Sequence, residues 1–164
     1  MKSVDLLIPC LNEAEGAEAL ITALSSAVAG LPSQRSHGQP GEGGGEAIAY
    51  QVLIVDDGSS DGTSERFEAL LQRPGPLAGG TIISLSRNFG KEAAILAGLS
   101  HCRADACIIM DADLQDPPEL IGPMVAAWLE GHEVVNAVRH DRSSDSLMKR
   151  LSSEGFYSLF LRLS

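Results

Sequence analysis

Residues 106–119 read ACIIMDADLQDPPE, and this stretch decides the fold class. Its apolar first part, residues 106–110, is typical of a buried strand. Two carboxylates, Asp111 and Asp113, follow that strand at once. A helical pattern then begins at Pro118, a position where the missing N–H of proline costs nothing. A strand, an acidic loop and a helix in this order predict one unit of an α/β fold.

The same alternation continues along the rest of the chain. Apolar runs predict strands at residues 4–8, 51–55, 81–85, 106–110 and 133–138. Helical patterns predict helices at residues 13–29, 60–72, 91–101 and 118–130. Strands of Val, Ile and Leu separated by helices predict an α/β fold with a mostly parallel sheet and helices on both faces.

The sequence predicts one domain over residues 1–140, followed by an amphipathic helix over residues 141–164. Residues 33–47 are rich in glycine and predict a flexible surface loop. Residues 146–164 combine an apolar helical face with Lys149, Arg150 and Arg162. This pattern fits a helix lying on an anionic membrane, and it equally fits an amphipathic helix packed on its own domain.

Composition excludes several classes of protein. The 164 residues are 44% hydrophobic, enough for a globular core, and the net charge of −10 argues against a nucleic-acid-binding surface. The three cysteines, Cys10, Cys102 and Cys107, form no C-x-x-C pair and are expected to be reduced, as in a cytoplasmic protein. No apolar run approaches the length of a membrane span, so we expect a soluble or peripheral chain.

Polar residues gather where the predicted strands end. They occupy residues 12–13, 56–59, 86–88 and 111–113. In open parallel sheets, ligands bind outside the carboxyl ends of the strands. The four clusters therefore predict a single site at one edge of the sheet. Asn12 is assigned to that site and is also a plausible N-cap of the first helix, as Ser60 or Asp61 is for the second.

Asp111 and Asp113 predict a metal site. Two neighbouring carboxylates repel each other and are costly to desolvate, so a cation should compensate them. Mg²⁺ and Mn²⁺ prefer oxygen ligands and are readily shared with a diphosphate. Gln115 could add a neutral oxygen. The interpretation fails if both carboxylates point away from any cleft or are already engaged by protein cations.

Three more residues have a ligand role and an ordinary alternative. Asp57, beyond a strand end, can accept hydrogen bonds from ribose hydroxyls or a base N–H. Glu13 can do the same, or it can be a first-turn acid favoured by the helix macrodipole. Lys91 opens a helix, where that dipole disfavours a cation. We therefore expect Lys91 to face an anion such as a diphosphate, with a solvated lysine as the alternative.

Four motifs in order resemble the inverting family-2 glycosyltransferases. They are IPCLNE (8–13), VDDGSSDGT (55–63), SRNFGKEAA (86–94) and MDADLQDPPE (110–119). The resemblance is closest to polyprenyl-phosphate sugar transferases, namely dolichol-phosphate mannosyltransferases and bactoprenol glucosyltransferases. It implies an A-type glycosyltransferase fold, Rossmann-like and nucleotide-sugar-binding. It also implies transfer with inversion from a UDP- or GDP-sugar to a polyprenyl phosphate, at the cytoplasmic face of a membrane.

The resemblance also implies roles for individual residues. Those around the base and ribose are Pro9, Glu13, Val55 and Asp57. Those around Mg²⁺ or Mn²⁺ and the diphosphate are Asp111, Asp113 and Gln115. Those near the acceptor phosphate and donor diphosphate are Arg139 and Lys149, with Arg150 as a neighbour that could substitute. Cys10 and Leu11 stand where relatives usually have a small residue and an aromatic one, and relatives continue beyond this length, so the chain is expected to be a fragment.

Other functions remain as alternatives at this point. A non-catalytic nucleotide-sugar-binding fragment would share the same motifs. A transferase acting on a saccharide hydroxyl would require a carboxylate base. A nucleotidyltransferase would need a glycine-rich, basic phosphate loop near the first strand, which residues 9–12 do not provide. A dehydrogenase would need a G-x-G-x-x-G after a strand, and none is present.

Overall fold

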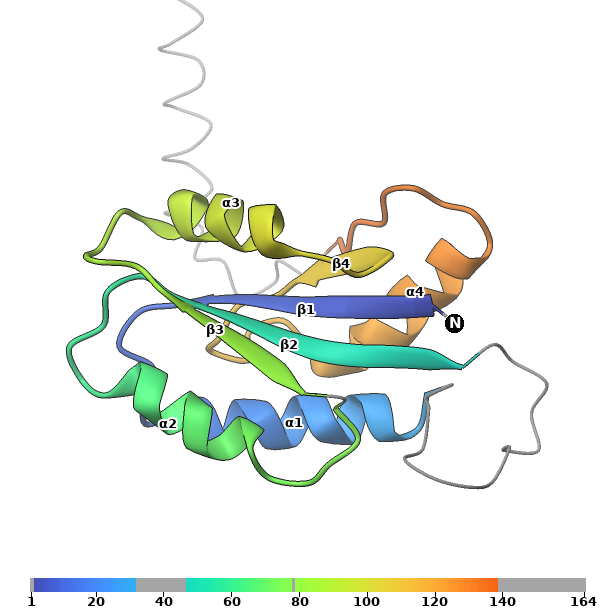
Figure 1. Ribbon diagram of the computed structural model, residues 1–164. Helices are drawn as coiled ribbons and strands as arrows, with labels where there is room; N and C mark the ends of the chain where they lie inside the picture. Colours follow the sequence, from blue (N-terminus) through green and yellow to red (C-terminus); the bar gives the residue numbers. More distant parts are fainter. Residues whose placement is uncertain (1, 32–46, 78, 139–164) are drawn as a thin grey trace, which may run out of the picture. The chain divides into compact units, whose positions relative to one another are not determined.

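The computed structural model describes residues 2–31, 47–77 and 79–138. Its strands are β1 (Lys2–Cys10), β2 (Ile48–Asp56), β3 (Gly80–Ser84) and β4 (Ala106–Ile109). Its helices are α1 (Ala17–Ala29), α2 (Thr63–Leu71), α3 (Lys91–His101), the 3-10 turn η1 (Pro118–Leu120) and α4 (Ile121–Leu129). Figure 1 shows these elements alternating along the chain, as the sequence predicts.

The sheet is parallel, with the strand order β3-β2-β1-β4. Strand β1 lies in the interior of the sheet, where Leu6 pairs with Val52 on one side and with Ile108 on the other. From Val4 to Cys10 every residue of β1 is buried. A strand covered on both faces has no solvent side, and its sequence is therefore mostly apolar. The exception is the buried Asp5, whose Oδ2 accepts the N–H groups of Arg103 and Ala104. The predicted parallel sheet is confirmed.

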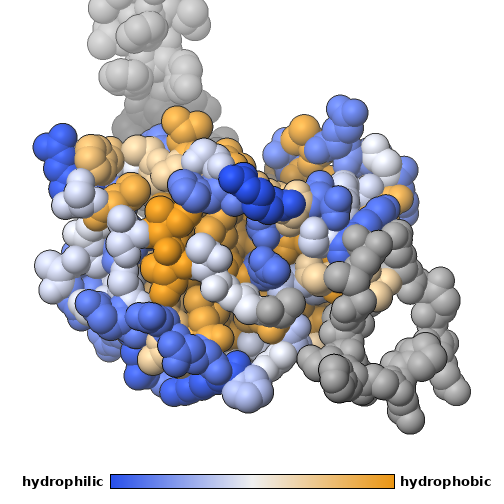
Figure 2. Space-filling view, in the orientation of Figure 1, coloured by the Kyte–Doolittle hydropathy of each residue, from blue (hydrophilic) through white to orange (hydrophobic). Residues whose placement is uncertain are grey.

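Helices cover both faces of the sheet (Figure 1). On one face, side chains of α1, α2 and α4 share a core with alternate residues of β1, including Leu6 and Ile8. On the other face, α3 packs through Ala94 against Leu7 and Val55. In the view of Figure 2, apolar surface lies between the two helical layers, over β3 at the sheet edge. This three-layer arrangement confirms the predicted fold class.

Helix α3 contacts the sheet closely at Gly98. A Cβ added at Gly98 would come within 2.6 Å of Leu7 Cδ1 and 2.9 Å of Val55 Cγ2. Atoms do not approach that closely, so any side chain at this position would require Leu7 and Val55 to shift. This packing sets the distance between α3 and the sheet, and with it the position of Lys91 at the first turn of the helix.

The predicted start of the first helix is wrong. Helix α1 begins at Ala17 with Gly16 as N-cap, and no side chain caps it. Asn12 adopts φ +56° instead, and its side-chain oxygen accepts the Ser60 N–H at 3.0 Å. Its own N–H donates to Ser59 Oγ at 2.8 Å. Asn12 therefore joins the loops after β1 and β2, which a polar residue can do as readily as it caps a helix.

The predicted N-cap of the second helix is also wrong, because Gly62 takes that position and Asp61 lies one residue before it. Its Oδ1 accepts the N–H of Thr63, the first residue of α2, at 3.1 Å. Its Oδ2 accepts the Ala14 N–H at 3.1 Å. Asp61 thus stabilises the start of the second helix from just outside it, and it ties that start to the loop after β1.

The predicted fifth strand is also wrong. Residues 133–138 have irregular backbone, and Val134 and Val138 are 78% and 73% exposed. An apolar run becomes a strand only where another strand pairs with it, and no described residue pairs with this segment. The chain divides into two compact units after Glu133. The predicted boundary at residue 140 lies beyond the described residues and stays a prediction.

Two further findings concern segments and spans. Most of the predicted loop at residues 33–47, and the predicted helix at residues 141–164, lie outside the described residues. In the part of the chain that the structure describes, no helix has the length and apolar character needed to cross a membrane.

Candidate functional site

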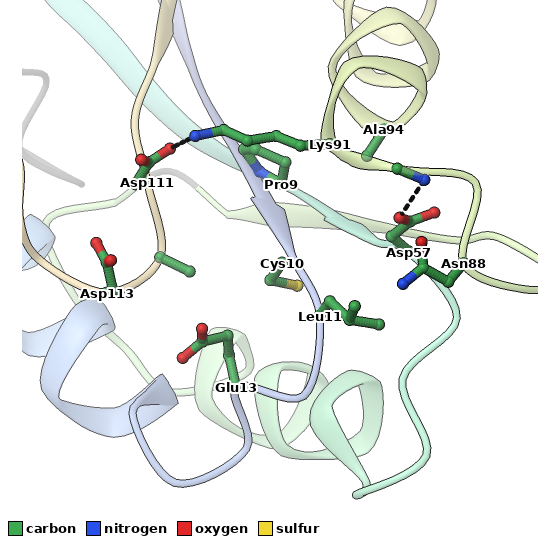
Figure 3. A pocket seen from close by; sticks show the side chains of 12 residues that line it. Pro9, Cys10, Leu11, Glu13, Asp57, Asn88, Lys91, Ala94, Asp111 and Asp113 are labelled. Carbon is green, nitrogen blue, oxygen red and sulfur yellow. Dashed lines mark hydrogen bonds and ion pairs between the residues drawn. The ribbon is translucent and has the colours of Figure 1, made fainter. Parts of the chain in front are cut away.

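A cavity of about 340 Å³ opens at the carboxyl ends of the strands (Figure 3). All four strand ends contribute to it. Its lining residues are Pro9, Cys10, Leu11, Glu13, Asp57, Asn88, Gly90, Lys91, Ala94, Asp111, Ala112 and Asp113. The polar clusters that the sequence places at separate strand ends therefore meet in one site, at the edge where parallel α/β sheets bind ligands.

Asp57 organises one side of this cavity. It is only 3% exposed, and its Oδ1 and Oδ2 accept the N–H groups of Phe89 and Gly90, each at 2.8 Å. The carboxylate therefore holds the loop that leads into α3. Each carboxylate oxygen has a second lone pair, so Asp57 retains acceptor capacity toward the cavity that it lines.

A glycine makes this close approach of loops possible. Gly58 has φ +79°, and a Cβ there would lie 2.5 Å from the carbonyl carbon of Arg87. Both the backbone conformation and the lack of space exclude a side chain. Asp56, two positions before Gly58, is buried and does not line the cavity, and it accepts the Ser59 N–H at 2.9 Å. The close contact at Gly58 and the hydrogen bond of Asp56 therefore hold the turn after β2 in one conformation.

Lys91 and Asp111 form an ion pair across the cavity wall. Lys91 Nζ lies 2.5 Å from Asp111 Oδ1, and the two side chains are 54% and 36% exposed (Figure 3). The hydrogen bond to Asp111 raises the pKa of Lys91, and the charges of Asp116 and Asp113 act in the same direction. Lys91 does face an anion, as expected, and in this structure the anion is Asp111.

Asp113 has a different environment. It is exposed, lines the cavity, and accepts the Gln115 N–H on Oδ1 at 3.0 Å. Among the described residues no cation pairs with it. The metal-site prediction requires carboxylates that face a cleft and are not engaged by a protein cation. Asp113 meets both requirements among the described residues. Asp111 meets only the first, because it is paired with Lys91.

Glu13 adds a third carboxylate on the same side as Asp113 (Figure 3). Burial raises its pKa first, followed by repulsion from Asp113 and then from Asp61. Glu13 precedes the N-cap of α1, so its interpretation as a first-turn helix acid is wrong. Its N–H donates to Thr63 Oγ1 at 2.8 Å, which fixes the backbone that carries it.

The donor atoms fit a hard divalent cation shared with a ligand. Asp111, Asp113 and Glu13 offer only oxygens, which Mg²⁺ and Mn²⁺ prefer. Within the described ranges no group of three metal-ligating side chains is arranged to hold an ion. Mg²⁺ is commonly bound by one or two carboxylates together with substrate phosphates, so ligand oxygens would complete the coordination of a cation held by Asp111 and Asp113.

Several lining residues have no role in the sequence-based prediction. Cys10 is one, and burial, then the charges of Asp56 and Glu13, raise the pKa of its thiol to about 12. It is a neutral group whose Sγ contacts the Val55 carbonyl oxygen at 3.6 Å. Its place at the carboxyl end of the central strand, beside Pro9, is the signal that could have identified it.

Other predicted site residues are not brought to the cavity. The side chain of Val55 is fully buried under α3, so it packs the core instead of lining a base site. Asn12 and Gln115 are exposed next to the cavity but do not line it. Arg139, Lys149 and Arg150 lie outside the described residues.

Comparison with known proteins identifies the family. The family model described as glycosyl transferase family 2 matches residues 5–163. An uncharacterised glycosyltransferase of Synechocystis sp. is 34% identical over 161 residues, which are 98% of this chain and 45% of the relative. A prophage bactoprenol glucosyl transferase homologue of Escherichia coli (strain K12) is 42% identical over 119 residues, 73% of this chain and 38% of the relative.

A third relative has a related name. An undecaprenyl-phosphate 4-deoxy-4-formamido-L-arabinose transferase of Salmonella choleraesuis is 38% identical over 156 residues, 94% of this chain and 42% of the relative. The chain thus spans less than half the length of the curated relatives it matches.

Solved structures share the fold at low identity. A mannosyltransferase from Pyrobaculum calidifontis, in complex with GDP-Man and Mn²⁺, superposes with a TM-score of 0.55 at 22% identity, covering 80% of this chain and 33% of that one. Residues 1–349 of TarS from S. aureus give 0.52 at 19% identity, covering 85% and 39%. These neighbours confirm the A-type glycosyltransferase fold. By the match along almost its whole length, the chain belongs to glycosyltransferase family 2.

Proposed function

We propose that the protein transfers a sugar from a UDP- or GDP-sugar to a polyprenyl phosphate. The observation that carries the proposal is the convergence of Asp57, Lys91, Asp111 and Asp113 on one cavity at the carboxyl ends of the sheet. Its volume of about 340 Å³ lies in the range of small-ligand sites. The relatives named for bactoprenol and undecaprenyl phosphate support the acceptor class.

The donor would lie across the cavity from the loop after β2 to the loop after β4. Pro9, Glu13 and Asp57 line the part assigned to the base and ribose, where carboxylate oxygens accept hydrogen bonds from hydroxyls. Lys91 and the acidic loop line the part assigned to the diphosphate. The rigid turn around Gly58 keeps the first part in place before a ligand arrives.

Asp111 and Asp113 would hold Mg²⁺ or Mn²⁺, with Gln115 close to Asp113 in the same loop. When bound, the ion supplies positive charge against the negative charge that develops on the leaving diphosphate. The chain's own residues orient the donor and exclude water from it. Lys91 adds a second positive charge at this end of the cavity.

The acceptor phosphate requires little help from a protein base. A phosphomonoester is largely ionised at neutral pH because its second pKa is about 6. One of its oxygens forms a bond to the anomeric carbon while the bond to the diphosphate oxygen breaks, and attack from the opposite side inverts the configuration. Arg139, Lys149 and Arg150 are proposed to approach this phosphate, at the cytoplasmic face of a membrane.

Calorimetry with nucleotides tests the donor half of the proposal. UDP and GDP are titrated into the 164-residue chain with Mn²⁺ and, separately, with a chelator. We expect one of the two nucleotides to bind, and only in the presence of the metal. Absence of binding by both nucleotides with Mn²⁺ present would refute the assignment of this cavity. Transfer of labelled sugar to undecaprenyl phosphate, against a saccharide acceptor, then tests the acceptor class.

A further inference from the structure

The starting observation is that one carboxylate of the acidic loop is already neutralised. Lys91 Nζ lies 2.5 Å from Asp111 Oδ1, and both residues line the cavity. Among the described lining residues, Lys91 is the only basic one, against the carboxylates of Glu13, Asp57, Asp111 and Asp113. As far as the structure describes the lining, the positive charge in the cavity therefore comes from a single side chain.

This ion pair competes with any cation that uses Asp111. An ammonium at hydrogen-bond distance occupies the carboxylate oxygen, and it would repel a divalent ion placed beside it. A metal ion that binds Oδ1 of Asp111, alone or together with Oδ2, must therefore displace Lys91. No large rearrangement is needed for this displacement, because the lysine side chain is about half exposed and its ammonium lies at the end of a flexible four-carbon stem.

The displaced Lys91 ammonium can pair with the negative oxygens of the ligand instead. A nucleoside diphosphate brings negative oxygens into the same part of the cavity, and a lysine ammonium is a common partner of phosphate. Lys91 begins α3, and the loop before it is held by the two hydrogen bonds to Asp57. The base of the side chain is thus fixed while its end is free to change partner.

We infer that Lys91 is an exchangeable counterion, which neutralises Asp111 in the absence of donor and transfers to the diphosphate when metal and nucleotide bind together. The inference rests on the proposed function and adds a mechanism of regulation to it. When the metal ion binds without nucleotide, the Lys91–Asp111 ion pair breaks and Lys91 is left without an anionic partner. When metal and nucleotide bind together, Asp111 pairs with the metal ion and Lys91 pairs with the diphosphate. Metal and nucleotide therefore bind cooperatively, and by linkage each increases the affinity for the other.

The test measures two affinities in one variant. Free Mn²⁺ is titrated by electron paramagnetic resonance into the wild-type chain and into Lys91→Met, without nucleotide. UDP and GDP are then titrated by calorimetry at saturating Mn²⁺. We expect Lys91→Met to bind Mn²⁺ alone about tenfold more tightly and the nucleotide about tenfold more weakly, a size typical of coupling between ligands.

Controls separate this effect from a general change of charge or folding. Lys2→Met removes the same charge at the opposite end of β1, next to Trp128, and should leave both affinities within about twofold of wild type. Lys91→Gln repeats the main variant with a polar side chain and should show the same opposite shifts. Far-ultraviolet circular dichroism verifies that each variant is folded.

The outcomes distinguish the inference from the function on which it rests. Opposite shifts in the two affinities support the exchange. Loss of both affinities, or no change in Mn²⁺ affinity with nucleotide binding retained, overturns the exchange and leaves the metal-dependent donor site standing. If wild type binds neither Mn²⁺ nor nucleotide, the proposed function fails, and the inference fails with it.

Discussion

The two sides of the cavity are built in different ways. After β2, the buried Asp57 accepts two backbone N–H groups and Gly58 packs directly under Arg87, so this side is fixed by short contacts. After β4, Asp111 and Asp113 are accessible, and among the described residues the cation paired with this loop is Lys91, which is half exposed and contacts Asp111. One side is preorganised, and we propose that the other depends on which ions are present. The two sides of the cavity thus have separate structural requirements.

The largest expected effect lies on the preorganised side. Gly58→Ala forces φ +79° on an alanine and places its Cβ 2.5 Å from backbone atoms of Arg87. We expect the free energy of unfolding to fall by about 3 kcal/mol, from strain and overpacking together. Urea denaturation measures it. Gly62→Ala is the matched control, because Gly62 has φ +86° but no close neighbour, and should lose only about 1 kcal/mol.

If the two alanine variants lose equal stability, the close contact between the loops is not what makes this side rigid. In that case the contrast between the two sides of the cavity would be reduced to a difference in exposure.

A smaller effect on stability, but a large one on binding, is expected on the ion-dependent side. Asp113→Ala removes a carboxylate with no described cation partner, so the free energy of unfolding should stay within about 0.5 kcal/mol of wild type. Mn²⁺-dependent affinity for UDP or GDP should fall by about 100-fold, roughly 2.7 kcal/mol. Calorimetry measures the affinity, and Glu119→Ala, an exposed acid outside the cavity lining, is the control. Unchanged affinity in Asp113→Ala would remove the metal role of this residue.

The smallest effect concerns pH. Burial and the charges of Asp113 and Asp61 raise the pKa of Glu13 above 4.5, so the folded chain keeps this proton to higher pH than the unfolded chain does. The associated stability is present below pH 4.5 and is lost as the pH rises through the raised pKa. Glu13→Gln should therefore be more stable than wild type at pH 7, by less than about 1 kcal/mol because solvent screens the group.

Thermal melts of wild type and Glu13→Gln between pH 4 and pH 7 test this dependence. The difference between the two proteins should grow as the pH rises. A glutamine variant that is equally stable throughout, or less stable at pH 7, would show that the acidic side of the cavity is not under electrostatic strain. Glu68→Gln, exposed on α2, controls for the loss of one charge.

The sequence predicts the fold well where local patterns decide it. The apolar runs around residues 4–8 and 51–55 lie on β1 and β2, and the polar residues after them do meet at one edge. The run at residues 133–138 is also rich in valine, but whether it becomes a strand depends on a partner distant in sequence. Composition cannot supply that information.

The candidate site is predictable in location but not in detail. A polar residue after a strand, such as Asn12, can cap a helix or join two loops, and only the three-dimensional arrangement decides between them. Lys91 illustrates the same limit. Its position at a helix start indicates an anionic partner, yet the partner seen here, Asp111, is 20 positions away in sequence and becomes a neighbour only through the parallel order of the strands.

The close packing at Gly98 has a consequence for how this protein can evolve. Because a Cβ at Gly98 would come within 3 Å of Leu7 and Val55, a bulkier residue there must shift those two side chains or α3 itself. Where α3 shifts, Lys91 at its first turn shifts with it, relative to Asp111. A change in the hydrophobic interior, with no polar atom involved, would then reset the charge balance of the cavity. Selection on ligand affinity therefore acts on residues that never touch a ligand.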